Sequence, residues 1–523
     1  MKNNKAAGDD GIVAELLKHL GPKSLGELTR IIQDIWTTEK LPESWKNALI
    51  VPLRKKGDKT DVNNYRGISL VQVTYKILSA TILKRVQEQL EHKIGEYQAG
   101  FRPNRSCSEQ IFNLKTILKL RHTRRQPTIC TFVDFQKAYD SIDRHSLFQI
   151  LDEYGLDRKT QSLIKQTLTD TTSQVKFMGE KSEKFQITTG VRQGDGLSPL
   201  LFNLALDKVM REWQQTLKDQ KHWKPLKISR KKIEVSCLAF ADDLAILAET
   251  KQQAIIQIEN LKECAAKIGL QISFPKTKVM SNLCDLQSLK TKFGTIEKVS
   301  EFRYLGEILE PSGKEGRAQE ARMQKMKRAF GRTQNVYNKK CISYPTKLRH
   351  YNAVIKPEVL YASETLDLNK KGALENILKE ERKIVRKILS PKLTDDGYRL
   401  QSRTKTEQLS NLAADIRKRR LKFYGHIHRL PDHRLTKKLL EATEILKANK
   451  WASEVKQDLK NAGIKETDLY DREVYRNKVN KWEVSSERDH KKKTGAKWTE
   501  ERRVLMKEKL RAAWERRRRA NQE

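Results

Sequence analysis

The chain has 523 residues, too many for one compact hydrophobic core, so several lobes or domains are expected. Lysine and arginine number 105 against 66 acidic residues, a net charge of +39, and this excess favours a polyanionic partner such as nucleic acid. Because no apolar run approaches the roughly 18 residues that span a bilayer, and none follows the basic start, neither a membrane partner nor a secretory signal is expected. Six cysteines are scattered without a C-x-x-C pair, which argues against a disulfide framework and a cysteine-based zinc site. An intracellular protein of the nucleus or the cytoplasm is predicted.

Secondary-structure signals along the chain indicate an α+β fold. The first 125 residues mix helical patterns at 12–20 and 75–94 with an extended apolar run at 48–51 that ends at Pro52. From 128 to 310, short β-rich runs alternate with helices, which predicts an antiparallel sheet covered by helices in a split βαβ arrangement. The predicted strands are 128–135, 184–188, 235–240 and 244–248.

Helices dominate the predictions elsewhere. Ser198 and Pro199 begin the best-defined one, with Ser198 as its N-cap and an apolar stripe that faces the core. The stripe consists of Phe202, Ala205, Val209 and Trp213. Beyond residue 311 strand signals fade, and basic helices are predicted at 314–338, 370–390 and 409–424.

Two adjacent aspartates lie between strand-like runs in CLAFADDLAIL (237–247). Strands that bury their apolar faces leave Asp242 and Asp243 close together and only partly solvated, a conflict that a divalent cation resolves. Adjacent aspartates also occur in ordinary solvated turns, so this segment alone leaves the two interpretations evenly balanced.

A third carboxylate favours the metal interpretation. In TFVDFQKAYDSID (131–143), Asp134 comes near the end of another apolar strand, so pairing of that strand with the hairpin brings three carboxylates to one edge of the sheet. Hard oxygen ligands suit Mg²⁺, with Mn²⁺ as a substitute, and two such ions roughly 3.5–4 Å apart serve nucleotidyl transfer. Asp140 and Asp143 are interpreted instead as helix-start charges on a solvated face.

Several segments, in this order, resemble the reverse transcriptases of non-LTR (LINE-type) retrotransposons over roughly residues 5 to 435. TFVDFQKAYDSID is similar to the family's first palm motif, TTGVRQGDGLSPLLFNL (188–204) to the second, and AFADD (239–243) to its catalytic hairpin. GLQISFPKTKVM (269–280) and FRYLGEIL (302–309) resemble the two motifs that follow. NNYRGISL (63–70) and YQAGFRPNRS (97–106) resemble finger motifs that hold template and incoming nucleotide.

This resemblance implies a right-hand polymerase fold and an activity. The fingers would occupy 1–125, a palm with an antiparallel sheet 126–310, a thumb-like helical region 311–400, and a basic, partly disordered nucleic-acid-binding region 401–523. The implied reaction is extension of a DNA primer on an RNA template from deoxynucleoside triphosphates; the oligomeric state is left open. Asp134, Asp242 and Asp243 would be catalytic metal ligands, with Phe135 also at the metals.

Other site residues follow from the same resemblance. Arg66 and Arg102 are implied to approach the triphosphate, a role that suits guanidinium chemistry, with ordinary surface arginines as the alternative. Gly190 and the loop of Gln193-Gly194-Asp195-Gly196 are implied to let the backbone approach the primer–template and the nascent pair. Gln193 and Gly194 thereby count as nucleotide-binding residues.

Two further residues have competing interpretations. Tyr139 lies five positions after Asp134, where the family places a bulky aromatic below the sugar of the incoming nucleotide, and a buried core tyrosine is the alternative. Lys276 falls where polymerases of this class are thought to protonate the leaving pyrophosphate, and a basic loop residue without that role is the alternative.

The chain also departs from the family pattern. Ser273 stands where relatives usually have asparagine, and Ala7 and Asp9 replace prolines of the opening block, which affects loop geometry but not the carboxylates. No segment resembles the apurinic-type endonuclease that many relatives carry before the polymerase, and no cysteine follows Cys341 to build a zinc knuckle. A polymerase part without an endonuclease domain is therefore expected.

The basic C-terminal region is predicted to clamp RNA. Stacking of unpaired bases on exposed indoles would add to phosphate neutralisation by lysines and arginines. Its tryptophans are Trp451, Trp482, Trp498 and Trp514, and Trp498, Trp514 and Arg516 are taken as nucleic-acid contacts. The histidines of KFYGHIHRLPD (422–432) and His433 lack a cysteine or acidic cluster at ligand spacing, so packing or RNA contact is favoured over zinc.

Two alternatives remain beside the reverse transcriptase. Another right-hand polymerase, such as a group II intron maturase or a viral RNA-dependent RNA polymerase, fits less well because Ala241 follows Phe240 in the catalytic turn and Tyr139 occupies the sugar position. A non-catalytic nucleic-acid-binding remnant would keep the fold, and the intact aspartate triad argues against it.

Overall fold

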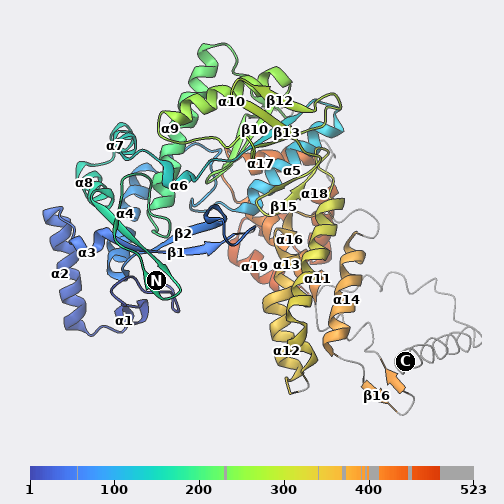
Figure 1. Ribbon diagram of the computed structural model, residues 1–523. Coiled ribbons are helices and arrows are strands. Elements are labelled where there is room, and N and C mark those ends of the chain that lie inside the picture. Colours follow the sequence, from blue (N-terminus) through green and yellow to red (C-terminus); the bar gives the residue numbers. More distant parts are fainter. Residues whose placement is uncertain are drawn as a thin grey trace, which may run out of the picture.

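A six-stranded sheet at the centre of the molecule positions the candidate site (Figure 1). The structure is a computed structural model that describes the chain except residues 56, 229–232, 340, 368–372, 390–391, 395–396, 400–410, 446–449 and 483–523. The strand order is β12-β13-β11-β3-β10-β9, and neighbours are antiparallel apart from β11 with β13. The strands are β3 (Ile129–Val133), β9 (Cys237–Phe240), β10 (Asp243–Ala248), β11 (Lys278–Ser281), β12 (Ser288–Thr291) and β13 (Gly294–Lys298). The α+β class is confirmed, and so are the predicted strands at 128–135, 235–240 and 244–248.

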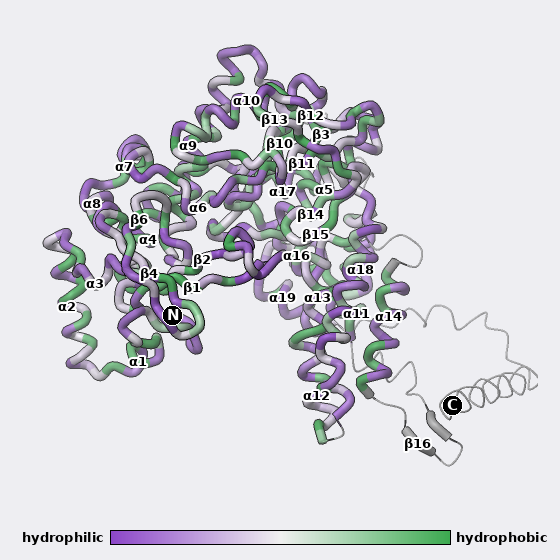
Figure 2. Tube along the Cα trace, in the orientation of Figure 1, coloured by the Kyte–Doolittle hydropathy of each residue, from purple (hydrophilic) through white to green (hydrophobic). Residues whose placement is uncertain are grey.

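The two faces of this sheet pack against different helices, because alternate residues of a strand point to opposite sides. Ile129 and Val133 of β3 share a hydrophobic cluster with residues of α9 (Ser198–Asp219) and α10 (Lys251–Ala266). Cys130 and Phe132 belong to a second cluster with α5 (Cys107–Thr123) and α17 (Leu435–Ile445). Figure 2 shows hydrophobic residues along the central strands, whereas the outer turns of α7 and α8 are mainly hydrophilic. Helix α5 is buried on most sides, since it lies between this sheet and the C-terminal helices.

The helix after β6 confirms one prediction and corrects a detail of it. All four residues of the predicted stripe on α9 are buried in the first cluster. Ser198 is the first helical residue rather than the N-cap; the N-cap position falls to Leu197, which makes no side-chain cap. Pro199 lies in the first turn, where its missing N–H costs nothing.

A second sheet lies beside the first and is built from strands that come before and after β3 in the sequence. Its order is β2-β1-β4-β5, with β6 paired to β4. The extended run predicted at 48–51 is shorter than the observed strand, since β1 continues past Pro52. Proline is tolerated there because β4 pairs only with the first half of β1, so no N–H donor is needed from Pro52 on that side. The strands are β1 (Asn47–Arg54), β2 (Tyr65–Leu70), β4 (Thr171–Phe177), β5 (Glu180–Lys181) and β6 (Phe185–Ile187), the last confirming 184–188.

Helices surround this second sheet and connect it to the first. The predicted helices at 12–20 and 75–94 are confirmed as α1 and α4. Asp9, one of the two proline replacements, forms an ion pair with Lys181 at 2.5 Å and so joins the N-terminal loop to β5. The helices are α1 (Ala14–Lys18), α2 (Pro22–Thr38), α3 (Glu43–Lys46), η1 (Val62–Asn64), α4 (Val73–Leu90), η2 (Glu91–Lys93), α6 (Ala138–Ser141), α7 (Arg144–Glu153) and α8 (Arg158–Leu168).

A helical lobe follows the strands of the six-stranded sheet and occupies the lower right of Figure 1. Its core contains Met326, Tyr351, Ile377 and Val385. The predicted helices at 314–338 and 370–390 are confirmed, and the fading strand signal agrees with a region in which one short hairpin follows α14. The elements are β14 (Phe302–Tyr304), β15 (Glu307–Leu309), α11 (Gly316–Asn338), α12 (Tyr344–His350), η3 (Tyr351–Ile355), α13 (Lys356–Leu360), η4 (Ser363–Thr365), α14 (Ala373–Leu389), β16 (Lys392–Thr394) and β17 (Gly397–Arg399). A short ribbon of β7 (Leu226–Lys227) and β8 (Glu234–Val235) precedes β9.

The C-terminal helices fold back onto α5 rather than extending away from it. Phe112 of α5 lies in one cluster with Phe423, Trp451 and Tyr475. The predicted helix at 409–424 is confirmed as α16, and within the described ranges no helix has the length and apolar character to cross a membrane. The remaining elements are α16 (Leu412–His428), α18 (Lys450–Asn461), η5 (Glu466–Leu469) and α19 (Arg472–Lys481).

Candidate active site

Three aspartates meet at one edge of the six-stranded sheet. Asp134 directly follows β3, and Asp243 begins β10, whose Leu244 pairs with Val133 of β3. Asp242 occupies the turn between β9 and β10. The strand pairing that the sequence predicts is therefore present, and it brings the three carboxyl groups into electrostatic contact.

Burial and mutual repulsion make these carboxyl groups hard to ionise. Burial is the main reason why the pKa of each aspartate lies above its ordinary value. Repulsion from Asp242 and then Asp134 adds to burial at Asp243 and raises its pKa to about 6. Among the described residues, the carboxyl Oδ2 of Asp134 is a buried atom that finds no hydrogen-bond partner.

These observations fit a divalent cation, whose charge offsets the repulsion and would lower all three pKa values. In the described part of the chain no three histidine, cysteine or acidic side chains are gathered tightly enough to hold one ion by themselves. Mg²⁺ does not need such a cage, because it is held by one or two carboxylates together with waters and substrate phosphates. The donor set therefore suits ions that complete their shell with substrate.

Arg66 and Gln193 form a polar network opposite the aspartates. Arg66 Nε donates to Gln193 Oε1 at 3.0 Å, and Gln193 Nε2 donates to Asp140 Oδ1 at 3.0 Å. The charge of Arg66 lowers the pKa of Asp242 in opposition to burial, so the guanidinium faces the site. The structure thus brings two predicted nucleotide-binding residues together; their role stays a prediction.

The two other aspartates of the first palm segment behave differently. Asp143 caps α7 by accepting from Ser146 N at 2.7 Å, and this bond lowers its pKa, so its interpretation as a helix-start charge is confirmed. Asp140 is exposed in the first turn of α6, so the same interpretation is confirmed for it; its carboxylate also accepts from Gln193 Nε2, and desolvation raises its pKa. The sequence carried no signal for this contact, since Gln193 lies 53 positions away.

Tyr139 is buried and also close to the catalytic turn. Its ring, 8% exposed, stacks on Phe202 of α9 with ring centroids 4.7 Å apart. Burial first, and then the charge of Asp242, raises its pKa. Both sequence interpretations describe part of this placement, and its role as a gate stays a prediction.

Lys276 and Phe135 lie next to Asp134. The exposed Lys276 occupies the turn before β11, and its charge opposes the rise in the pKa of Asp134. Phe135 is buried and forms an isolated bridge with Ile272. Ser273, the position where relatives have asparagine, donates its backbone N–H to the carbonyl of Asp134 at 2.8 Å, a bond that any residue but proline makes.

Residues 53–309 match the family model described as reverse transcriptase (RNA-dependent DNA polymerase). The chain carries a reverse transcriptase domain. It is similar to the Pol polyprotein of the type-2 retrotransposable element R2DM of Drosophila melanogaster, 25% identical over 317 residues, which are 58% of this chain and 28% of the relative. The RNA-directed DNA polymerase from the mobile element jockey of Drosophila funebris is 23% identical over 419 residues, 74% of this chain and 42% of the relative. The predicted resemblance to non-LTR retrotransposon enzymes is confirmed.

The chain spans less than half the length of these curated relatives. Among solved structures, the chain is similar to apo telomerase from Candida Tropicalis, with 12% identity and a TM-score of 0.40. The match covers 87% of this chain and 74% of the telomerase chain. Reverse transcriptases as a family use divalent metal ions and bind an RNA template and DNA.

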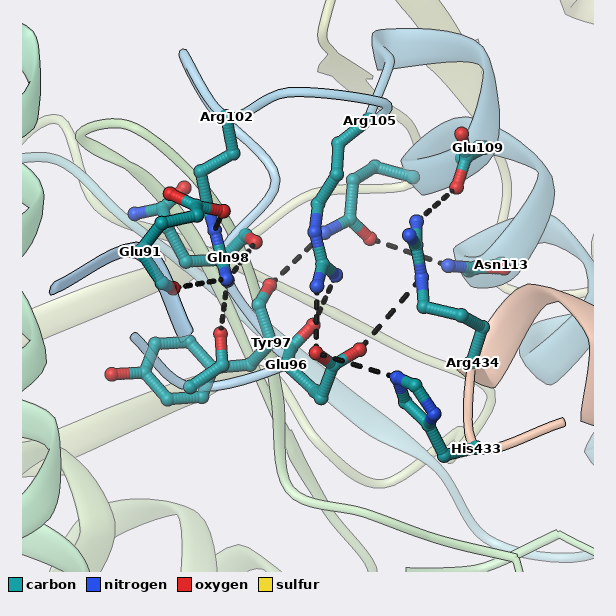
Figure 3. Close-up of polar contacts among 12 residues, drawn as sticks. Glu91, Glu96, Tyr97, Gln98, Arg102, Arg105, Glu109, Asn113, His433 and Arg434 are labelled. Carbon is teal, nitrogen blue, oxygen red and sulfur yellow. Dashed lines mark hydrogen bonds and ion pairs between the residues drawn. The ribbon is translucent and has the colours of Figure 1, made fainter. Parts of the chain in front are cut away.

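Arg102 is buried within its own loop in this reverse transcriptase domain. Its guanidinium donates to the carboxylate and carbonyl of Glu91 and to the carbonyls of Gly95 and Gln98 (Figure 3). Four of its five donor hydrogens are therefore used inside the loop, and its approach to the triphosphate stays a prediction.

The predicted glycines are required for contacts within the domain. Gly190 has φ +74°, and a Cβ there would lie 2.5 Å from the backbone of Asp140. Gly194 has φ +117°, and its Cβ would lie 2.5 Å from the carbonyl of Ser69. Side chains are thus excluded by the protein's own backbone, so approach of a primer–template is not needed to explain these glycines.

In the C-terminal region one prediction is corrected and another is confirmed. Trp451 is 1% exposed and donates its indole N–H to the carbonyl of Glu364 at 2.9 Å, so it is a core residue and not an RNA platform. His426 contacts Glu109 at 3.0 Å while His428 packs against Tyr424, which separates the histidines and favours packing, as predicted. Trp498, Trp514, Arg516 and the disorder predicted for this end lie outside the described residues.

Sequence reasoning missed one buried carboxylate that orders the whole domain. Asp207 on α9 accepts from Gly95 N at 2.7 Å, Tyr97 OH at 2.5 Å, Tyr154 OH at 2.6 Å and Arg211 Nε at 2.7 Å. A lone acidic residue inside the apolar stretch of α9 was the available signal, because such a charge must be paired when buried.

Proposed function

We propose that this chain is an RNA-directed DNA polymerase of a non-LTR retrotransposon, which extends a DNA primer on an RNA template. The observation that supports this most is the meeting of Asp134, Asp242 and Asp243 where β3 and β10 pair, inside a domain of the reverse transcriptase family. Three carboxyl groups with raised pKa values meet there, and one oxygen of Asp134 has no hydrogen-bond partner among the described residues, an arrangement that suits two Mg²⁺ ions.

Each residue of the site then has a defined task. Asp134, Asp242 and Asp243 would hold the cations, which would supply activation of the primer 3′-hydroxyl and charge stabilisation of the leaving pyrophosphate. Arg66, fixed in direction by Gln193, binds the triphosphate of the incoming deoxynucleotide, and Lys276 donates a proton toward the pyrophosphate.

Tyr139 gives the site its preference for deoxynucleotides. The ring is held by its stack on Phe202 and cannot swing away easily, so a ribonucleotide 2′-hydroxyl placed above it meets a fixed surface. Rejection by such a clash separates two substrates more sharply than attractive contacts do.

Primer extension on an RNA template tests this function directly. The purified chain should incorporate deoxynucleotides only with Mg²⁺ or Mn²⁺, and Asp242→Asn should abolish incorporation while primer–template binding, which depends on lysines and arginines elsewhere, stays near wild type. Asp143→Asn is the matched control: it makes the same chemical change in the same palm, and asparagine caps a helix as aspartate does.

The outcomes also separate the alternatives. Nucleic-acid binding without incorporation by the wild-type chain would indicate a non-catalytic remnant. Preferred incorporation of ribonucleotides would indicate an RNA-making polymerase. Undiminished activity of Asp242→Asn would refute the two-metal assignment.

A further inference from the structure

The turn that carries Asp242 and Asp243 has a backbone that needs support. Ala241, directly before them, has φ +54°, in the left-handed region that residues with a Cβ disfavour. A conformation of this kind persists only where the surrounding structure holds it. Because Asp242 is the next residue, the direction of its side chain depends on how firmly Ala241 is held.

The side-chain amide of Gln98 holds both backbone groups of Ala241. Gln98 Oε1 accepts from Ala241 N at 2.8 Å, and Gln98 Nε2 donates to the Ala241 carbonyl at 3.2 Å. Gln98 is 1% exposed, and its Oε1 also accepts from Gly100 N at 2.8 Å. No other hydrogen bond to Ala241 N is found among the described residues, so the amide of Gln98 is its partner.

The segment that carries Gln98 is itself docked on the catalytic strand. Ala99 N donates to the Ala239 carbonyl at 2.9 Å, and Ala239 N donates to the Tyr97 carbonyl at 2.8 Å, so residues 97–99 run along β9. A Cβ at Gly100 would lie 2.1 Å from Ala241 N, which shows how closely the two segments approach.

Ion pairs tie this loop to the C-terminal helices (Figure 3). Arg105 pairs with Glu96 at 2.6 Å within the loop. Arg434, before α17, pairs with Glu96 at 3.7 Å and with the buried Glu109 of α5 at 2.6 Å. Residues more than 300 positions apart in sequence thus converge on the loop that supports the catalytic turn.

We propose that Gln98 is a positioning residue for Asp242 and Asp243, and that Arg434 braces its loop from the C-terminal helices. The proposal rests on the proposed polymerase function and adds to it a way in which residues outside the palm set the geometry of the metal ligands. The C-terminal helices are then part of the catalytic unit rather than an appended binding module.

A second buried glutamine provides the matched control. Gln110 donates its Nε2 to the carbonyls of Tyr97 and Ala239, on the same strand edge as Gln98. Ala239 O also accepts from Ala99 N, and Tyr97 O from Ala239 N, so Gln110→Leu leaves neither carbonyl unpaired. Gln98→Leu, in contrast, strips Ala241 N of its partner and frees the turn.

The experiment compares direct Mn²⁺ binding and primer extension for wild type, Gln98→Leu and Gln110→Leu. Removing a group that orients metal ligands lowers metal affinity or activity by about 10- to 100-fold. Gln98→Leu should show this loss in Mn²⁺ affinity and in kcat, with KM for primer–template unchanged; Gln110→Leu should stay within about threefold of wild type. Wild-type Mn²⁺ affinity in folded Gln98→Leu would overturn the proposal, and so would an equal loss in both variants.

The brace is tested separately with Arg434→Gln. It should weaken Mn²⁺ binding in the same direction as Gln98→Leu, and the double variant should lose no more than the larger single loss, because both act through one loop. Lys437→Gln removes the same charge three positions later, where Lys437 pairs with Asp432 and donates to the Leu430 carbonyl, both outside the loop, so this variant should bind Mn²⁺ like wild type. Full additivity would remove Arg434 from the proposal. A wild-type chain that binds Mn²⁺ but never extends a primer would instead refute the polymerase function while leaving the positioning result interpretable.

Discussion

Metal binding by the aspartate triad should weaken steeply between pH 7 and pH 5. The pKa of Asp243 is raised to about 6, chiefly by burial and then by Asp242 and Asp134, and a cation binds only the ionised form. With that pKa the carboxyl is protonated in about one molecule in ten at pH 7 and about nine in ten at pH 5, so proton competition lowers the apparent affinity about tenfold. Below pH 5 the affinity should continue to fall, by about tenfold per pH unit.

The same shift predicts the direction of stability in the metal-free protein. A carboxyl whose pKa rises from 3.8 to about 6 on folding contributes stability that is complete below pH 3.8 and lost as pH rises through 6. Saturating Mn²⁺ should reverse this loss at pH 7, because it binds the folded form. Thermal unfolding at pH 5 and pH 7, with and without Mn²⁺, compares the stability of the protein under these conditions.

The assay is titration of the free protein with Mn²⁺ at pH 5, 6 and 7, with unbound Mn²⁺ followed by electron paramagnetic resonance. Asp243→Asn should bind more weakly at pH 7 and lose most of the pH dependence. Asp143→Asn, which alters a carboxyl with a lowered pKa, should keep the wild-type slope. Equal wild-type affinity at pH 5 and pH 7, or an undiminished slope in Asp243→Asn, would refute this reasoning.

Three further predictions test other parts of the molecule. Tyr139→Val should raise the ratio of ribonucleotide to deoxynucleotide incorporation and, because the stack on Phe202 is lost, lower the free energy of unfolding by about 2 kcal/mol; an unchanged ratio in a folded variant contradicts the gate. Asp207→Asn should lower the free energy of unfolding in urea by about 2–4 kcal/mol, since four donors lose a charged acceptor, and a change below about 0.5 kcal/mol would show that the network is dispensable. Deleting 483–523 while keeping the helices before it should weaken RNA binding and flatten its salt dependence. An unchanged salt slope would mean that this segment makes no phosphate contacts.

The elements that could be predicted from the sequence are those whose cause is local. The apolar run before Asp134 and the hairpin around Asp242 specify strands by alternation, and antiparallel pairing then places the carboxylates on one edge. Trp451 was misjudged for the opposite reason, because its surroundings come from a distant segment: Glu364, whose carbonyl accepts from the Trp451 indole, is 87 positions away. The partners of Arg102 lie only 4 to 11 positions away, but the loop conformation that brings them together leaves no mark in the sequence pattern. The contact between Asp140 and Gln193 was missed because only the fold brings these two residues together.

Several features that cost the fold stability come together at the candidate metal site. A left-handed Ala241, a buried partnerless oxygen on Asp134 and three carboxyls with raised pKa values all lie at the ends of β3 and β10. Directly behind them the same strands are packed on both faces by hydrophobic clusters that hold the strained edge in position. Replacing one of these aspartates by asparagine would relieve repulsion and stabilise the metal-free protein. A remnant without catalytic use would therefore become more stable by losing any of them. A chain that keeps all three, together with the Gln98 amide that fixes their turn, has the arrangement that a working metal site requires and that folding alone disfavours.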